Sequence, residues 1–363
     1  MSDLAYKSAT ICFWSGTGNS YRVTRWMETI AENSGLETKI LPLDKTKPSK
    51  LLQTGDRGFI GIVFPTHGFT APWHVWKSVF NLPQGKSTHV FCIATRAGLK
   101  FGPVFIPGIS GSATFVIALI LILKGYKVRG TMSVDMPSNW FSLHPIQNRT
   151  SHEAIIDRAE QKISTFTTKV LARSTIWFTG NNLYEILLGT LLSLVSVGYL
   201  LFGRFFLAKL FFANNRCDGC GICERYCTVK AISMRGKDRR LPFWKYSCES
   251  CMKCAAFCPH NAIETGHSWG VILYFITTIP ISVYLMSLFG ADSTRIETVH
   301  TSLAGNLLNI LYFYPAIIVS YSIFSLLIRV PFINYLFTHT TMTHLSFWGR
   351  YKEPKTKLKD MSQ

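Results

Sequence analysis

The strongest constraint in the sequence is a cysteine-rich unit that occurs twice, displaced by 31 residues. The first unit runs from Arg216 to Ile232 and the second from Ser247 to Ile263, and each has the spacing C-x2-C-x2-C-x3-C. Eight of the ten cysteines in the chain fall in these two units. Thiolates are soft ligands that favour zinc and iron–sulfur clusters, so the duplication predicts a small metal-binding unit.

The spacing distinguishes between these two kinds of metal site. Three thiolates that lie three residues apart in a tight loop can bind three irons of an iron–sulfur cube. A zinc site, the alternative, usually shows well-separated C-x2-C pairs that give four ligands to one ion. Two adjacent four-cysteine units fit the zinc pattern poorly, so the spacing favours two [4Fe–4S] clusters.

Residues 214–266 resemble bacterial two-cluster ferredoxins, in which the fourth cysteine of each unit binds the other cluster. The family also has a proline after that cysteine; Pro259 matches it, whereas Thr228 departs from it at a turn and leaves the ligands unchanged. The resemblance implies two ligand sets, one of Cys217, Cys220, Cys223 and Cys258 and the other of Cys248, Cys251, Cys254 and Cys227.

The two remaining cysteines, Cys12 and Cys92, lie in predicted strands, and we expect them to be ordinary core residues. The first residues, Met1 to Leu4, do not have the pattern of a signal peptide. Together with cysteines spaced for metal binding, this predicts a reducing cytoplasm and free thiolates.

The N-terminal part alternates short apolar runs with amphipathic stretches, the pattern of an α/β domain with a mostly parallel sheet. A closing helix is predicted over 152–171. Strands are predicted over 9–14, 37–43, 58–64, 88–94 and 126–134.

A loop of small residues joins the first predicted strand to a helix, with the sequence Ser15-Gly16-Thr17-Gly18-Asn19-Ser20. Backbone N–H groups at a helix N-terminus bind phosphate, and glycines allow its close approach. The loop lacks the motifs of nucleotide hydrolases and of dinucleotide-binding folds. It resembles the FMN phosphate loop of flavodoxins, which implies a doubly wound sheet of order 2-1-3-4-5 with FMN at its switch point.

Two further loops are expected to flank the flavin ring, Thr66-His67-Gly68-Phe69 and Thr95-Arg96-Ala97-Gly98, each after an apolar strand. With the cysteine units, the arrangement resembles flavodoxin–ferredoxin fusions, a family of electron carriers. Residues 136–140, after the last predicted strand, also resemble that family. The alternative is a flavodoxin-like domain that binds no flavin and serves for docking.

Hydrophobic residues make up 48% of the chain and its mean hydropathy is +0.20, which predicts membrane segments. Runs 186–203, 269–291 and 302–328 are free of charge and long enough to cross a bilayer. The run 101–123 is broken by proline and glycine, which leaves about 12 helical residues, too few to span. We expect 112–124 to be a buried helix of the α/β domain.

Basic residues flank the first of these runs on both sides, and the positive-inside rule assigns both flanks to the cytoplasm. We therefore expect 183–212 to be re-entrant or interfacial, with only 269–291 and 302–328 crossing as a hairpin. A single ordinary span is the alternative. The two crossing runs contain no acidic, basic or histidine residue, so they are predicted to anchor the chain without forming an ion path.

The chain thus divides into five parts. They are a flavodoxin-like FMN-binding domain (1–173), an apolar membrane segment (174–213), a two-cluster ferredoxin domain (214–266), a transmembrane hairpin (267–330), and an interfacial segment with a basic cytoplasmic tail (331–363).

These features predict a membrane-attached protein that relays electrons between FMN and two [4Fe–4S] clusters, at the cytoplasmic membrane of a prokaryote with its redox domains facing the cytoplasm. The net charge of +18 predicts contact with anionic lipid headgroups and with a redox partner protein. Nucleic acid is excluded, since no nucleic-acid motif accompanies the charge.

No catalytic acid–base pair is apparent, and two alternatives stay open. One is an oxidoreductase that itself reduces a lipid-soluble acceptor such as a quinone. The other is a non-catalytic docking or assembly subunit that carries clusters without flavin.

Overall fold

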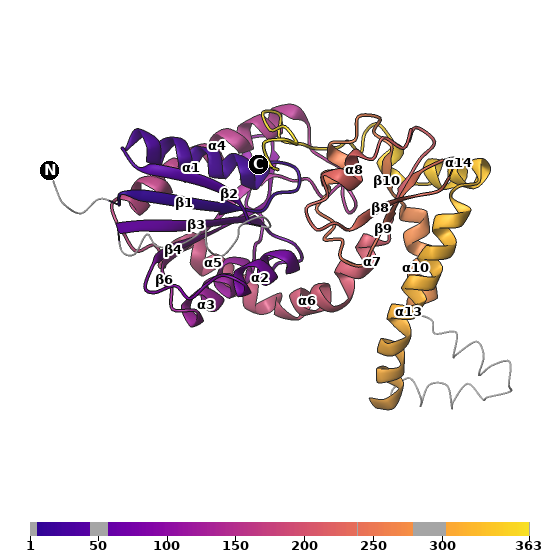
Figure 1. Cartoon of the computed structure of the whole chain (residues 1–363), viewed down its shortest axis with the longest axis horizontal. Coiled ribbons are helices and arrows are strands. Elements are labelled where there is room, and N and C mark those ends of the chain that lie inside the picture. The colour runs from indigo at the N-terminus through magenta and orange to yellow at the C-terminus, as the bar shows by residue number, and fades with distance from the viewer. Residues whose placement is uncertain (1–5, 44–56, 238, 279–302, 363) are drawn as a thin grey trace.

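A computed structural model describes residues 6–43, 57–237, 239–278 and 303–362 (Figure 1). Its N-terminal part is built on a parallel sheet in the order β2-β1-β3-β4-β6, the 2-1-3-4-5 order of flavodoxin-like folds. The predicted α/β class and all five predicted strands are confirmed. The strands are β1 (Ser8–Phe13), β2 (Glu37–Pro42), β3 (Gly58–Pro65), β4 (His89–Phe101) and β6 (Lys127–Pro137).

Helices cover both faces of this sheet, and alternate residues of each strand point to opposite faces. Ile11 and Phe13 of β1 pack with α1 (Asn19–Asn33) and α4 (Arg149–Leu171), which confirms the predicted closing helix. Cys12 and Trp14 face the other side, toward α2 (Trp73–Phe80) and α3 (Ala113–Leu123). Cys12 and Cys92 are fully buried there, as predicted for core residues.

Two sequence-based expectations for this domain are wrong. Residues 95–98 were expected to form a loop, but β4 continues to Phe101, because Arg96 pairs with Asp135 of β6 and the chain then folds into a hairpin with β5 (Val104–Ile106). Helix α3 exists, but it is not buried throughout: one side packs in the core, while Leu119 and Leu123 on the other are 55% and 77% exposed.

The cysteine-rich part repeats its structure as it repeats its sequence. Strand β7 (Phe211–Ala213) pairs with β10 (Ile263–Thr265), and β8 (Ile232–Arg235) pairs with β9 (Leu241–Trp244), both antiparallel. The short helices α8 (Ile222–Arg225) and α9 (Lys253–Ala256) are in contact and begin 31 residues apart, the displacement of the repeat.

Apolar helices connect and follow these two parts. The connecting segment is bent by 68° between Gly180–Leu191 and Ser193–Ala208, and Asn309–Leu327 is long and apolar enough to cross a membrane. The hairpin predicted over 269–291 and 302–328 lies partly outside the described residues. The helices are α5 (Gly180–Leu191), α6 (Ser193–Gly198), the π-helix η3 (Tyr199–Gly203), α7 (Arg204–Ala208), α10 (His267–Thr278), α13 (Leu303–Leu327) and α14 (Pro331–His339), with a 3-10 turn, η4 (Met342–His344).

The C-terminal residues return from the cysteine-rich part to α1, so the C-terminus lies beside α1 and α4 (Figure 1). The hydroxyl of Tyr351 donates to Asn19 Oδ1 at 2.8 Å. Glu353 is buried and forms an ion pair with Arg22, and Met361 enters the core beneath α1 and α4. Sequence alone predicted an interfacial segment and a basic tail; in the structure residues 350–361 form a C-terminal strap that contacts the loop 15–20 and α1.

Helix α5 is fixed to the domain by a buried carboxylate. Glu185 forms an ion pair with Arg96, and both side chains are almost fully buried. The same carboxylate accepts hydrogen bonds from the backbone N–H groups of Ser110 and Gly111, at 2.9 and 2.6 Å. Arg96 also binds Asp135, so one cation joins α5 to β4 and β6.

Glu185→Ala should therefore destabilise the N-terminal domain by about 3 kcal/mol, the lower end of the range for breaking a buried ion pair, because Asp135 still binds Arg96. Chemical denaturation of the detergent-solubilised protein measures this change. The control is Glu153→Ala, which removes an exposed pair with Arg149 and should cost less than about 1 kcal/mol. Equal effects of the two substitutions would contradict the anchoring role.

Candidate functional site

The loop 15–20 lies where β1 ends and α1 begins, and internal hydrogen bonds hold it. Gly18 has a φ of 106°, a left-handed conformation that glycine adopts readily. Its N–H donates to Ser15 Oγ at 3.2 Å. Thr17 Oγ1 accepts from Asn139, and the hydroxyls of Ser20 and Thr95 are 2.9 Å apart. The N-terminus of a fifteen-residue helix thus opens onto this loop.

A cavity of about 530 Å³, its open mouth included, lies against the loop. Ten of the fourteen predicted flavin-site residues line it: Ser15, Gly16, Thr17, Asn19, Ser20, Thr66, His67, Thr95, Arg96 and Ala97. Four predicted residues are not among the lining residues, namely Gly18, Gly68, Phe69 and Gly98.

Six further lining residues were not predicted as site residues: Pro65, Pro137, Ser138, Asn139, Trp140 and His144. Pro65 directly precedes a predicted loop. Four of the others belong to the 136–140 segment, whose resemblance to flavodoxin–ferredoxin fusions was the signal that pointed to them. His144 carried no signal in the sequence.

His67 supplies a neutral, aromatic wall to this cavity. It is 6% exposed, and its ring stacks on that of Trp140 with centroids 5.4 Å apart. Burial lowers the pKa of His67 to about 4, opposed by a hydrogen bond to the Glu249 backbone. The imidazole is therefore uncharged at neutral pH.

Next to His67, Thr66 Oγ1 is buried without a hydrogen-bond partner among the described residues. A buried hydroxyl without a partner is costly, so this atom marks a place for a polar group of a ligand. Arg96, also at the cavity, has its charge balanced by Asp135 and Glu185. The cavity thus offers polar atoms and aromatic rings with little free charge.

Cysteines of the two repeats lie close enough to influence one another's charge. Burial raises the pKa of Cys223, and the charges of Cys217, Cys220 and Cys258 raise it further. Burial also raises the pKa of Cys254, and the charges of Cys248, Cys251, Cys223 and Cys227 add to this increase. Each of these two thiols is thus influenced by the fourth cysteine of the other repeat, and they lie on α8 and α9, two helices that are in contact.

Backbone N–H groups face the sulfur atoms at equivalent places in both repeats. Ala231 donates to Cys227 Sγ at 3.2 Å, and Ala262 donates to Cys258 Sγ at 3.3 Å. Such hydrogen bonds stabilise charge on a sulfur ligand and help to set the potential of an iron–sulfur cluster.

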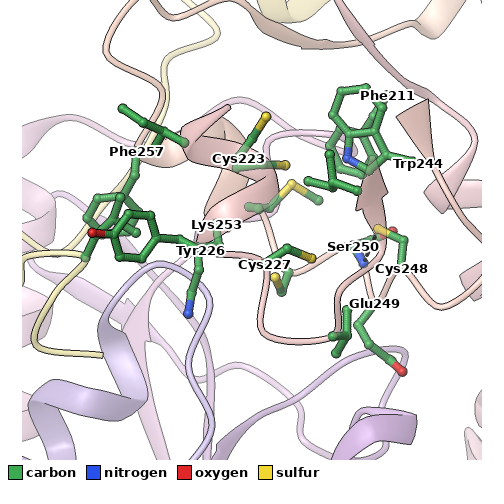
Figure 2. A pocket seen from close by; sticks show the side chains of 17 residues that line it. Phe211, Cys223, Tyr226, Cys227, Trp244, Cys248, Glu249, Ser250, Lys253 and Phe257 are labelled. Carbon is green, nitrogen blue, oxygen red and sulfur yellow. Dashed lines mark hydrogen bonds between the residues drawn. The ribbon is translucent and has the colours of Figure 1, made fainter. Parts of the chain in front are cut away.

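A cavity of about 470 Å³, its open mouth included, lies among five of the cysteines. Figure 2 shows the labelled Cys223, Cys227 and Cys248 around it, with Phe211 and Trp244 on one side. Among the described residues, no group of three or more His, Cys, Asp or Glu side chains could hold a metal ion. The ligand assignment of each cysteine therefore stays a prediction.

The two cavities lie on either side of a close backbone contact between the loop 15–20 and the loop 249–251. A Cβ atom at Gly16 would overlap with the carbonyl oxygen of Cys251, so only glycine allows this approach. The indole N–H of Trp140 donates to the carbonyl oxygen of Ser250 at 2.9 Å. The loop 249–251, which lines the second cavity, therefore packs against Gly16 and Trp140, which line the first.

No family model matches the sequence, and no match to a curated protein is found. Among solved structures, a flavodoxin from the domain Archaea is 14% identical with a TM-score of 0.29, covering 44% of this chain and 99% of its own. A Streptococcus pneumoniae TIGR4 flavodoxin is 15% identical with a TM-score of 0.30, covering 44% and 98%. Flavodoxin 1 from Bacillus cereus is 14% identical with a TM-score of 0.32, covering 46% and 97%. At these TM-scores the likeness carries no argument, and the flavodoxin-like fold rests on the strand order.

Proposed function

We propose that the protein relays electrons between FMN, held in the cavity at the loop 15–20, and two [4Fe–4S] clusters, held by the two groups of cysteines. The observation that supports this most is the packing of Gly16 against Cys251. It brings a phosphate-type loop and a cysteine loop into direct contact, which neither a lone flavin site nor a lone metal site requires.

The residues at the first cavity fit FMN. The N-terminus of α1 and the buried hydroxyls of Thr17 and Ser20 suit a phosphate. The buried Thr66 hydroxyl, which has no partner among the described residues, is available for a hydrogen bond to FMN. The stacked rings of Trp140 and His67 offer an apolar surface to a ring system. FMN, when bound, exchanges one or two electrons, whereas a cluster exchanges one at a time.

The second site offers the free thiols that two clusters would need as ligands. Each group supplies four thiols, one for each iron of a cube, and the N–H groups of Ala231 and Ala262 stabilise charge on Cys227 and Cys258. Cys223 and Cys254 lie on α8 and α9, which are in contact. This arrangement supports electron passage from one cluster to the other.

The chain's own residues hold the two sites against each other. Gly16 admits the loop 249–251, and the hydrogen bond from Trp140 to Ser250 fixes that loop against the flavin cavity.

We further propose that the protein works at the cytoplasmic membrane of a prokaryote, where a redox partner protein accepts or supplies the electrons. The apolar α13 and the bent α5–α6 segment support membrane attachment. The basic residues between Arg204 and Lys245 suit anionic lipid headgroups.

A lipid-soluble acceptor such as a quinone is the second candidate, and one contact favours it. Tyr199, from the apolar connecting segment, lies edge-on to His67 with ring centroids 6.5 Å apart. The membrane segment therefore contacts the wall of the flavin cavity.

Removing the hydroxyls of the phosphate loop should weaken FMN binding. Thr17→Ala and Ser20→Ala should each cost about 1–3 kcal/mol, since each removes a hydrogen bond to a charged acceptor. Fluorescence titration of flavin-stripped protein with FMN measures this, with exposed Ser34→Ala at the far end of the same helix as the control. If the Thr17→Ala/Ser20→Ala double variant binds FMN as tightly as the wild type, the phosphate lies elsewhere.

Enlarging Gly16 should separate the two redox sites. Gly16→Ala forces the loop 249–251 away, at a packing cost of about 1–3 kcal/mol, and electron transfer from FMN to the clusters should slow. Flash reduction of the flavin, followed by cluster absorbance, measures this rate in protein with full iron and FMN content. Gly180→Ala, where a Cβ meets nothing within 4 Å, should leave the rate unchanged. An unaltered rate in Gly16→Ala would show that electrons take another route.

A further inference from the structure

One side of α3 carries large apolar side chains that nothing in the described chain covers. Leu119, Ile122 and Leu123 are 55%, 49% and 77% exposed. The opposite side of the same helix packs Ile117 and Leu121 into the core. A helix at the surface of a domain in water normally has one apolar side and one polar side, whereas α3 is apolar on both sides.

The bent connecting segment adds a second apolar surface beside the first. Its inner side is fixed next to the start of α3, because a Cβ at Gly189 would overlap with Gly111, and Ser196 Oγ donates to the carbonyl oxygen of Phe69. Figure 1 shows α3 and α6 on the same side of the molecule. The outer side of the segment exposes Leu183, Leu187, Leu191, Leu194, Val197 and Leu201. We call the exposed apolar residues of α3, α5, α6 and η3 the apolar platform.

Aromatic and basic side chains border this platform. Helix α2, which contacts α3, carries Trp73, Trp76 and a half-exposed Phe80. The guanidinium of Arg204 lies 5.2 Å from the Trp73 ring centroid. Lys124, at the end of α3, donates to the carbonyl oxygen of Phe80 at 2.9 Å. Tryptophan with lysine and arginine is the composition found at the surface of a bilayer.

The platform continues without interruption onto the helix that is able to span a membrane. Tyr314 of α13 donates its hydroxyl to the carbonyl oxygen of Leu201 at 2.7 Å. The ring of Phe202 packs edge-on against Phe313, with centroids 5.2 Å apart. Leu311 on α13 is 67% exposed. A soluble protein partner would have to cover the platform and this helix together, whereas a bilayer covers both.

We propose that the apolar platform lies in the surface layer of the lipid bilayer that α13 enters, so that the flavodoxin-like domain itself rests on the membrane through α3. This inference rests on the membrane attachment in the proposed function and adds a surface of the flavin domain to it. One consequence is that Tyr199 stands between the bilayer surface and His67 of the flavin cavity. The flavin site then lies directly above the lipid.

Site-specific photocrosslinking of the full-length protein tests this placement. The photoreactive residue benzoylphenylalanine replaces Leu123 in one variant, and the protein is placed in nanodiscs of phosphatidylcholine and phosphatidylglycerol. Two further variants serve as references, with the same residue at Leu311 on α13 and at the exposed Thr29 on α1, which covers the other face of the sheet. Iron and FMN contents are measured on each sample, and only samples that match the wild type are compared.

The expected result is lipid crosslinking from position 123 at least several-fold above that from position 29. If position 311 crosslinks lipid while position 123 stays at the level of position 29, the platform proposal is overturned and membrane attachment stands. If neither position 311 nor position 123 crosslinks lipid, membrane attachment fails and the platform fails with it. In both cases the cofactor contents report separately on the electron relay.

Discussion

The approach of the loop 15–20 to the loop 249–251 is the contact on which the rest of the structure depends. Gly16 has no side chain at the point where Cys251 passes, and Trp140 holds the neighbouring carbonyl oxygen of Ser250. Two parts of the chain that are far apart in sequence therefore form one site. In the proposed function, this contact between a flavin cavity and a cysteine cavity is the place where electrons pass.

Other interactions keep that contact in place. The C-terminal strap links the two parts, because Arg350 binds Glu264 of β10 while Glu353 binds Arg22 of α1. Its course is so close to the loop 15–20 that a Cβ at Gly18 would meet Glu353. From the other side, Glu185 ties the apolar connection to Arg96. These ion pairs join segments that are far apart in the sequence. They hold the parts of the chain that carry the two cavities in place.

The sequence was most informative where local pattern decides structure. Short apolar runs that form strands buried on both faces, a small-residue loop before a helix, and a repeat of four cysteines each carry their signal within a few residues. The extension of β4 past Thr95 carried no such signal, because it depends on pairing with β6, where Arg96 lies opposite Asp135. The strap could not be foreseen either, since Tyr351 and Glu353 acquire their partners only in the folded chain.

The exposed side of α3 was missed for a related reason. Its continuous apolar sequence predicts burial, and only the placement of the sheet shows that Leu119 and Leu123 face outward. Hydropathy reports that a residue avoids water, but it does not distinguish a protein core from a lipid surface.

The most direct test of the account is the cofactor content of the full-length protein, purified anaerobically in detergent. The account predicts about eight irons, eight acid-labile sulfides and one FMN per chain, with the visible absorption of [4Fe–4S] clusters. One or two zinc ions per chain, with neither flavin nor visible absorption, would contradict it.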